Sequence, residues 1–285
     1  MKRKPTIAVV GAGNLARALA PQLKRAGYRV TEVVSRDGAS SRAKARAVAK
    51  SAGARAVGFE EARFDADVVW ICVSDSAIAA IGQRLARGRD WHGRVALHSS
   101  GALASDELRA LRGRGASIGS LHPMMTFTGA KPPALRGLTF AVEGDAKAAR
   151  IARQIALDLG GEPFAIRKRQ KTLYHALGSF SSPLLVMLLA EAEQVGKGAG
   201  LSPAQTRKVM RAILRRTLEN YFASGAAAAF SGPLHRGDLV TVKRHMKELR
   251  KVPGALEVYR ALAKATLRTL PVGRRGEMQK VLGIR

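Results

Sequence analysis

The sequence is poor in several residue types, and each shortage excludes a class of protein. A single cysteine, Cys72, among 285 residues rules out an internal disulfide framework and suits a reducing compartment. The six histidines lack the paired spacing of zinc sites, so we predict no metal. The basic start of the chain leads into only a short apolar run, and no run approaches the roughly 18 uncharged apolar residues of a membrane span. We therefore expect a cytoplasmic protein with no signal peptide and no membrane contact.

Acidic residues are also scarce, which leaves a large positive charge. The chain has 49 lysines and arginines against 21 acidic residues, a formal net charge of +28. Such an excess suits a phosphate-rich partner such as nucleic acid. The alternative is a general arginine bias that solvates helix faces, because the arginines are spread along expected helices and no nucleic-acid motif accompanies them. We prefer the second interpretation and keep nucleic acid as a minor alternative.

The first part of the chain alternates between expected strands and helices. Strands are expected at residues 6–10, 29–34, 66–73, 94–98, 117–121 and 139–142, and helices at 14–26, 41–52, 76–85, 105–112 and 146–159. Such alternation predicts an α/β fold, a doubly wound parallel sheet with helices on both faces. This is the pattern of a Rossmann domain.

Beyond a basic run at residues 167–171 the strand signals stop and long helices follow. We expect one helix over residues 172–198 and a second that begins at the Ser202-Pro203-Ala204-Gln205 signature and ends near residue 223. A third helix is expected from the cap Asp238 to residue 250, and a fourth over residues 254–270, before a short basic tail. The sequence thus predicts a Rossmann domain at residues 1–165 and an all-α domain at residues 166–285.

A glycine-rich turn joins the first strand to the first helix. Gly11 allows the tight turn, Gly13 lets the backbone approach a pyrophosphate, and the small Ala16 lets helix and strand pack closely. Asn14 and Leu15 open the helix whose N-terminus faces the anion. We predict a dinucleotide site here; a glycine turn that binds no nucleotide is the alternative.

The residues after the second strand select the dinucleotide. NAD sites normally place a carboxylate there to bind the ribose 2′-hydroxyl, but this chain has Ser35 and Arg36. A guanidinium beside a hydroxyl can hold a 2′-phosphate by charge-assisted hydrogen bonds, so we predict NADP as the cofactor. In the alternative, Arg36 points to solvent and Asp37 binds the ribose. Further cofactor contacts are expected where two later strands end, at Val73, Ser74, Asp75, Ser99, Ser100 and Gly101, although the last three also suit an ordinary polar turn.

Four short strings, in serial order over nearly the whole chain, resemble a known family. They are H-S-S-G-A from His98, S-L-H-P-M from Ser120, Y-H-A from Tyr174 and G-P-L-H-R-G-D from Gly232. With the glycine turn, they resemble the superfamily of pyrroline-5-carboxylate reductase, ketopantoate reductase and the 6-phosphogluconate and 3-hydroxyisobutyrate dehydrogenases. More narrowly, the chain is similar to Rossmann-like proteins whose C-terminal half is the domain of unknown function twenty-five twenty.

The resemblance implies an NADP-linked oxidoreductase fold with a C-terminal domain like that of 6-phosphogluconate dehydrogenase. It also implies a homodimer, because the helices of this domain pack across a dimer interface in the related reductases. It implies no particular reaction. The chain departs from the family at Ser181-Ser182, where a serine-asparagine pair is usual, so an asparagine contact to substrate or nicotinamide is not expected.

The first long helix carries a polar stripe. Lys171, His175, Ser179 and Ser182 share one face at spacings of four, four and three residues. In the related dehydrogenases a lysine of the equivalent helix protonates the oxygen while hydride reaches the carbon. Here His175 is our first candidate for that proton transfer, because imidazole titrates near neutral pH, and Lys171 is the second. The alternatives are a core histidine and a solvated lysine.

Other residues complete the candidate site. His122 precedes Pro123 at the expected end of a strand and is a third catalytic candidate; the alternative is a turn histidine that caps a backbone group. Ser179, Ser182 and Arg236 are candidate substrate contacts.

Together these features predict an NADP-dependent oxidoreductase that moves hydride between NADP(H) and a small polar molecule with a C=O or C=N group. A catalytically silent NADP-binding sensor or scaffold is the main alternative, because a fold does not fix a function. A basic nucleic-acid-associated protein is the third interpretation. The substrate and the direction of the reaction stay open.

Overall fold

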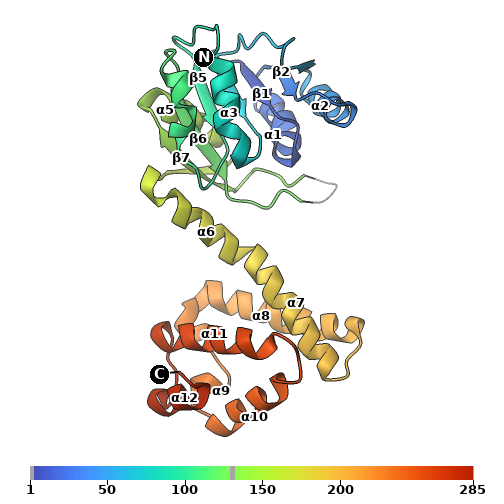
Figure 1. The fold of residues 1–285 in the computed structure, drawn as a ribbon, viewed down its shortest axis with the longest axis vertical. Coiled ribbons are helices and arrows are strands. Elements are labelled where there is room, and N and C mark those ends of the chain that lie inside the picture. Colours follow the sequence, from blue (N-terminus) through green and yellow to red (C-terminus); the bar gives the residue numbers. More distant parts are fainter. Residues whose placement is uncertain (1–2, 129–131, 285) are drawn as a thin grey trace. The chain divides into compact units, whose positions relative to one another are not determined.

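The computed structural model describes residues 3–128 and 132–284 (Figure 1). It divides into two compact units, Met1–Phe180 and Ser181–Arg285. The strands of the described residues all lie in the first unit, and the second is helical.

The first unit alternates strands and helices as expected. Its strands are β1 (Ile7–Val10), β2 (Val30–Ser35), β3 (Arg55–Gly58), β4 (Val68–Ile71), β5 (Val95–His98), β6 (Ser117–Pro123), β7 (Thr139–Gly144) and β8 (Glu162–Ala165). Its helices are α1 (Asn14–Arg25), α2 (Ala39–Ala52), α3 (Asp75–Ala86), α4 (Arg109–Arg112) and α5 (Ala146–Asp158), with the short 3-10 turns η1 (Ser105–Leu108) and η2 (Lys168–Gln170). Helix α6 (Lys171–Ser181) ends at the boundary with the second unit.

The eight strands form one sheet in the order β3-β2-β1-β4-β5-β6-β7-β8. Every neighbouring pair is parallel except β6 and β7. The strand order reverses between β1 and β4, and open α/β sheets bind ligands outside the carboxyl ends of strands at such a point. The predicted Rossmann fold is therefore confirmed, but β7 and β8 run opposite to the other six strands, which the sequence did not reveal.

Each face of the sheet has its own apolar core. On one face, α1, α2 and α5 bury small and branched side chains such as Leu19, Val48 and Ile155 against β1 and its neighbours. On the other face, α3 and the turn before α4 bury Ile78 and Leu108. These two layers of helices hold the carboxyl ends of the strands, and the loops that follow them, in fixed positions.

Some local predictions differ from the structure. Strands β3 and β8 were not expected, and the basic tail forms helix α12 (Arg275–Leu282). The single helix predicted over residues 172–198 breaks at Ser182, whose φ of −132° and ψ of −81° are not helical. The reason is Pro183, because proline disfavours the helical conformation in the residue before it.

The second unit contains α7 (Pro183–Gly198), α8 (Pro203–Ala229), α9 (Pro233–Arg236), α10 (Leu239–Leu249), α11 (Ala255–Thr269) and α12. The predicted helix starts are confirmed: Ser202 and Gln205 bond reciprocally at the start of α8, and Asp238 accepts from Thr241 N–H at 3.0 Å at the start of α10. Helix α8 extends past the predicted end near residue 223, but its helical backbone is interrupted at Gly225, whose φ of 76° and ψ of 172° are not helical. A small core of residues from α10, α11 and α12, including Met246 and Met278, holds this unit together.

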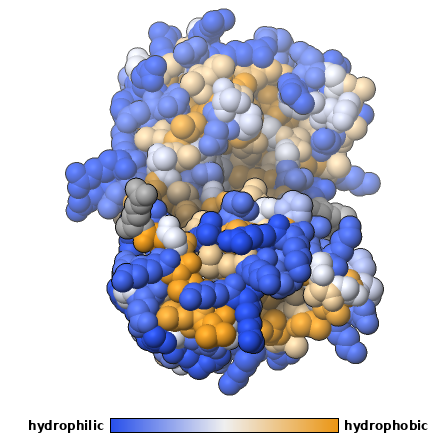
Figure 2. Space-filling view, turned by 60° about the horizontal axis from the view of Figure 1, so that its bottom comes forward, coloured by the Kyte–Doolittle hydropathy of each residue, from blue (hydrophilic) through white to orange (hydrophobic). Residues whose placement is uncertain are grey.

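Helices α7 and α8 leave much apolar surface open. No residue of α7 is buried, and the 27-residue α8 buries only Thr206. Figure 2 shows apolar residues gathered on the surface of this unit among charged ones. The stretch Lys168–Gly198 is also long and apolar enough to cross a membrane by length and composition alone. This differs from our expectation that no run of the chain approaches the length of a membrane span.

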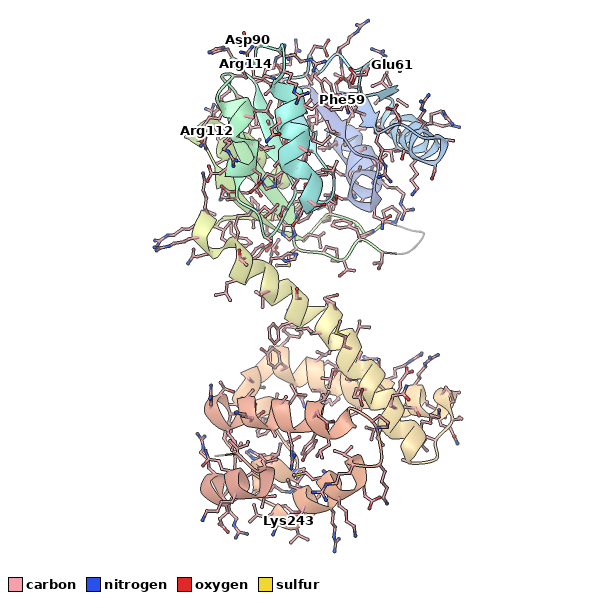
Figure 3. The ribbon with its side chains drawn as sticks, in the orientation of Figure 1. Phe59, Glu61, Asp90, Arg112, Arg114 and Lys243 are labelled. Atoms are coloured by element: carbon pink, nitrogen blue, oxygen red, sulfur yellow. The ribbon has the colours of Figure 1, made fainter. Side chains whose placement is uncertain are left out.

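The excess positive charge is not confined to one unit. Arg112 and Arg114 lie on the outside of the first unit and Lys243 on the outside of the second (Figure 3). Arg112 pairs with Asp106 and Asp145, at 3.2 and 2.8 Å. Such exposed pairs contribute little to stability.

Candidate functional site

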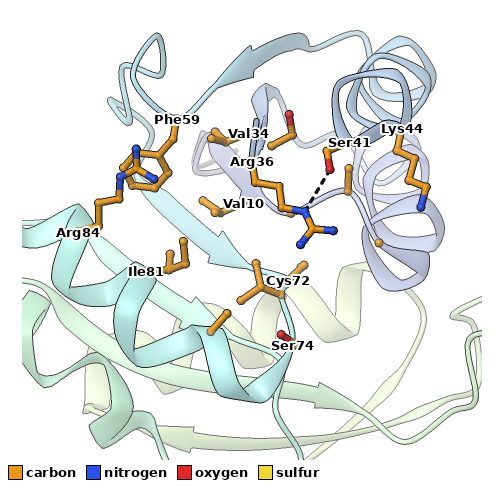
Figure 4. Close-up of a pocket in the computed structure, with 16 residues that line it drawn as sticks. Val10, Val34, Arg36, Ser41, Lys44, Phe59, Cys72, Ser74, Ile81 and Arg84 are labelled. Carbon is orange, nitrogen blue, oxygen red and sulfur yellow. Dashed lines mark hydrogen bonds between the residues drawn. The ribbon is translucent and has the colours of Figure 1, made fainter. Parts of the chain in front are cut away.

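A cavity of about 380 Å³ opens where β1, β2 and β4 end, at the reversal of the strand order (Figure 4). The predicted cofactor residues that line it are Gly11, Gly13, Ser35, Arg36, Val73 and Ser74. The structure therefore brings together three segments that are far apart in the sequence.

The glycine turn has the geometry that its sequence predicts. Gly11 has a φ of +107°, and a Cβ there would lie 2.4 Å from the carbonyl oxygen of Cys72, so only glycine fits. Beside Gly13 no described atom lies within 4 Å of the place a Cβ would occupy, which leaves open space for a ligand. Ala16 is fully buried where α1 packs on the sheet.

The end of β2 fits a 2′-phosphate. Arg36 Nε donates to Ser41 Oγ at 3.2 Å, and Lys44 lines the same cavity (Figure 4). Ser35 Oγ is buried and has no hydrogen-bond partner among the described residues, although buried hydroxyls normally have one. Two cations and an unpaired hydroxyl at one place suit an added phosphate.

Asp37 does not take part in this arrangement. Its carboxylate is exposed, lies 3.6 Å from Arg42, and lines a separate hollow rather than the cofactor cavity. The alternative in which Asp37 binds the ribose therefore finds no support in the geometry.

Six predicted cofactor residues lie outside the lining of this cavity: Asn14, Leu15, Asp75, Ser99, Ser100 and Gly101. Asn14 is exposed at the first position of α1, and the side chain of Leu15 packs against the apolar core. Asp75 accepts a hydrogen bond from Ser100 Oγ at 2.8 Å. The side chains of Leu15 and Asp75 therefore make contacts within the protein, and the contacts of Asn14, Leu15 and Asp75 with the cofactor stay predictions.

The loop after β5 is held by many bonds within the protein. Ser99 Oγ accepts from Trp70 Nε1 at 2.7 Å. The backbone N–H of Ser100 donates to His98 Nδ1 at 3.1 Å, and burial lowers the pKa of His98 to about 3, so this ring is neutral. The hydroxyl groups of Ser99 and Ser100 are thus hydrogen-bonded within the protein, and Gly101 has only backbone atoms to offer a ligand.

The imidazole rings of His122 and His175 lie close to Gly101, and the phenol of Tyr174 lies beside His122. His122 Nδ1 lies 3.1 Å from Tyr174 Oη, and the rings of His122 and His175 are 6.2 Å apart, edge to face. Burial, helped by the positive charges of Lys171 and His175, lowers the pKa of His122 to about 4, and burial raises the pKa of Tyr174 to about 12. His122 and Tyr174 are therefore neutral near pH 7, whereas the ring of His175 is exposed.

Lys171 is buried, with 1% of its side chain exposed. Its Nζ donates to the carbonyl oxygen of Ser100 at 2.9 Å and to Ser120 Oγ, and lies 3.7 Å from Glu143 Oε1. Burial lowers the pKa of Lys171 to about 8, against the opposing pull of Glu143 and Asp75. The solvated-lysine alternative is therefore wrong.

The predicted substrate residues are divided between the units. Ser179 belongs to the first unit, and its hydroxyl donates to the carbonyl oxygen of His175 at 3.4 Å. Ser182 stands at the start of α7, and Arg236 is exposed at the end of α9, both in the second unit. The structure brings His122, Lys171 and His175 together in the first unit, and the substrate contacts of Ser179, Ser182 and Arg236 stay predictions.

Sequence reasoning missed Glu143, Ser105 and Ser120. Glu143 is an acidic residue near the end of an otherwise apolar strand. This position indicated that its carboxylate would be buried and would need a partner. Its partner could not be identified, because the opposition of Ser120 and Glu143 depends on the antiparallel pairing of β6 and β7. Among the described residues, no group of three or more His, Cys, Asp or Glu side chains is placed to hold a metal ion.

Comparison with known families gives a match for the Rossmann part of the chain and another for its C-terminal part. Residues 6–96 match a family described as NADP oxidoreductase, coenzyme F420-dependent, and residues 138–266 match the domain of unknown function DUF2520. The first description names NADP, which confirms the cofactor predicted from Arg36. No protein with a curated function matches the chain by sequence.

Solved structures share the fold at low sequence identity. BF3122 of Bacteroides fragilis, a proposed NADP oxidoreductase, is 23% identical with a TM-score of 0.75, over 92% of this chain and 97% of that one. An imine reductase from Pseudomonas sp. is 18% identical with a TM-score of 0.64, over 98% and 100%. A reductive aminase from Aspergillus terreus, in complex with NADPH and ethyl-5-oxohexanoate, is 18% identical with a TM-score of 0.63, over 98% and 99%.

The first family match covers β1 to β4 of the sheet, and the second covers β7, β8 and most of the helices that follow. The chain therefore combines a Rossmann part similar to the NADP oxidoreductase family with the domain of unknown function DUF2520 in its C-terminal part.

Proposed function

We propose that the protein is a reductase that transfers hydride from NADPH to a small polar molecule with a C=N or C=O group. The observation that carries the proposal is the arrangement of one sheet edge. Three parts of the site follow the carboxyl ends of strands of a single sheet. They are the glycine turn after β1, Arg36 after β2, and the loop after β5 that contacts His122 and His175.

Bound NADPH would supply the hydride, and the chain has to supply a proton. His175 suits this role best, because its ring is exposed and an imidazole can donate a proton to a bound substrate. His122, kept neutral by burial, and the hydroxyl of Tyr174 stand beside it and can relay a proton. A donor that protonates nitrogen or oxygen as hydride arrives avoids a charged intermediate.

Two related folds support the choice of substrate class. An imine reductase and a reductive aminase act on C=N bonds, and both match this chain over nearly its full length. The match concerns the fold, so the substrate class remains our proposal. It favours C=N over C=O as the first group to test.

The test is NADPH oxidation by purified protein with a panel of cyclic imines, ketone and amine pairs, small ketones and coenzyme F420, which the family description names. We expect turnover with a member of the panel. His175→Ala should lower kcat by about 100-fold, a typical contribution of a positioned proton donor, and should leave NADPH binding intact. NADPH binding without turnover of any compound would favour the sensor interpretation instead.

We also propose a homodimer formed through α7 and α8. These helices expose large apolar side chains, including Met187, Val209, Ile213 and Phe222, which are 61% to 80% exposed. Contiguous apolar patches of this kind mark interaction sites, because their burial is favourable. A second copy of the same unit would cover them.

Light scattering at micromolar concentration tests the dimer. The wild-type protein should have twice the chain mass, and the double variant Val209→Glu, Ile213→Glu should be monomeric. A wild-type monomer would contradict the dimer. Binding of the monomer to lipid vesicles would instead assign the apolar stretch to a membrane.

A further inference from the structure

A buried ion pair lies behind the candidate site, and the proposed reaction does not use it directly. Lys171 Nζ and Glu143 Oε1 are 3.7 Å apart, and their side chains are 1% and 3% exposed. Burying two charges costs free energy that their attraction recovers only when further hydrogen bonds satisfy both groups. The surroundings of the pair show what those bonds hold together.

The carboxylate of Glu143 holds the turn that follows the loop after β5. Its two oxygens accept from the backbone N–H of Ser105 at 2.5 Å and from the Ser105 hydroxyl at 2.9 Å. Ser105 is fully buried. Glu143 also stands directly opposite Ser120 in the register of β6 and β7. Three elements therefore meet at one carboxylate.

The ammonium of Lys171 joins helix α6 to the same place. It donates to the carbonyl oxygen of Ser100 and to Ser120 Oγ, and the carboxylate of Glu143 lies 3.7 Å away as its ion-pair partner. An ammonium has three N–H donors, and two of them are therefore bonded within the protein. With 1% of its side chain exposed and two donors taken, Lys171 is poorly placed to reach a substrate.

The loop that Lys171 holds supports both imidazole rings. Next to Ser100, Gly101 packs so closely that a Cβ there would lie 2.8 Å from His122 Nε2 and 2.9 Å from His175 Cδ2. His175 also stands four residues after Lys171 on α6, one helical turn away. The ring positions therefore depend on the buried pair through the loop and through the helix.

We propose that Lys171 and Glu143 are positioning residues that fix the rings of His122 and His175 for proton transfer, and that Lys171 is not the proton donor. The inference rests on the proposed function, since it concerns how the rings of that site are held.

Kinetics of Lys171→Met, Glu143→Gln and the double variant test the proposal in the full chain. Each single change should lower kcat by about 100-fold, because a small misplacement of reacting groups costs that much, with little change in the Kd of NADPH. The double variant should lose little more than either single one, because the residues act through one pair. Lys168→Met is the matched control, since it removes an exposed lysine that pairs with Asp106, and it should keep its activity.

A pH profile separates positioning from proton donation. The titratable groups around Lys171 are Glu143, Asp75, His98 and His122. If Lys171 only positions the rings, the residual activity of Lys171→Met keeps the basic limb of the wild-type profile, while loss of the positive charge lets the pKa of His122 rise. Loss of the basic-limb pKa in Lys171→Met, with full activity in Glu143→Gln, would overturn the proposal. Full activity of both single variants would overturn it too.

Proton NMR of the imidazoles gives a readout that needs no substrate. Both single variants should shift the Cε1 proton resonances of His122 and His175, and Lys168→Met should not. Should the charge variants fail to fold, Ser105→Ala, which removes only one bond to Glu143, should give smaller shifts of the same resonances. Unchanged resonances in the folded variants contradict the positioning role, whereas a wild-type protein without turnover contradicts only the proposed function.

Discussion

Replacing Arg36 by alanine is expected to weaken NADPH binding by about 10- to 100-fold, because a hydrogen bond to a charged group contributes about 1.5–3 kcal/mol. NADH binding should hardly change, since NADH has no 2′-phosphate for the guanidinium to hold. Isothermal titration calorimetry with both nucleotides measures the two affinities. Raising the salt concentration should reduce the NADPH affinity of the wild type, because the site is exposed.

Arg42→Ala is the matched control for this prediction. Arg42 has the same charge and follows the same strand, but it faces Asp37 and lines the neighbouring hollow. Its replacement should leave both affinities within about twofold, as expected of an exposed ion pair. Equal losses of NADPH and NADH affinity in Arg36→Ala would show that the arginine contributes to folding or to general binding, and not to recognition of the 2′-phosphate.

Gly101→Ala is expected to reduce kcat by about 100-fold, the usual cost of displacing reacting groups by about 1 Å. The added methyl would lie within 3 Å of the rings of both His122 and His175, so at least one ring must move. NADPH should still bind, because the cofactor cavity is lined by other residues. Steady-state kinetics and nucleotide titration on the same preparation check both statements.

Gly113→Ala serves as the control for Gly101→Ala. Gly113 has a helical φ of −62°, and a Cβ there would meet only atoms at 3.6 Å or beyond. The control should keep wild-type kcat. Wild-type kcat in folded Gly101→Ala would show that the reaction does not depend on the positions of the two rings.

The cofactor site was largely predictable from sequence because it depends on local rules. A tight turn between β1 and α1 needs Gly11, and close packing needs a small residue at Ala16, so both appear as a readable string. The residue after β2 is also fixed by position along the chain. The choice of Arg36 over Asp37 followed from charge alone, and the lining of the cavity agrees with it.

The catalytic side of the site was less predictable, because it depends on contacts between distant strands. The antiparallel pairing of β6 and β7 places Glu143 opposite Ser120. The periodicity of the sequence does not show whether neighbouring strands run parallel or antiparallel. Without that pairing, the catalytic candidate Lys171 could not be distinguished from a solvated lysine of the basic run. By contrast, the break at Ser182 was readable from Pro183, and the strength of the helical pattern on both sides concealed it.

Transfer of label from the cofactor tests the central claim most directly. NADPH that carries deuterium at the nicotinamide C4 position is incubated with the protein and the best imine or ketone of the panel, and the product is analysed by mass spectrometry. We predict one deuterium on the carbon of the former C=N or C=O group. Tight NADPH binding with no deuterium in any product would contradict the account.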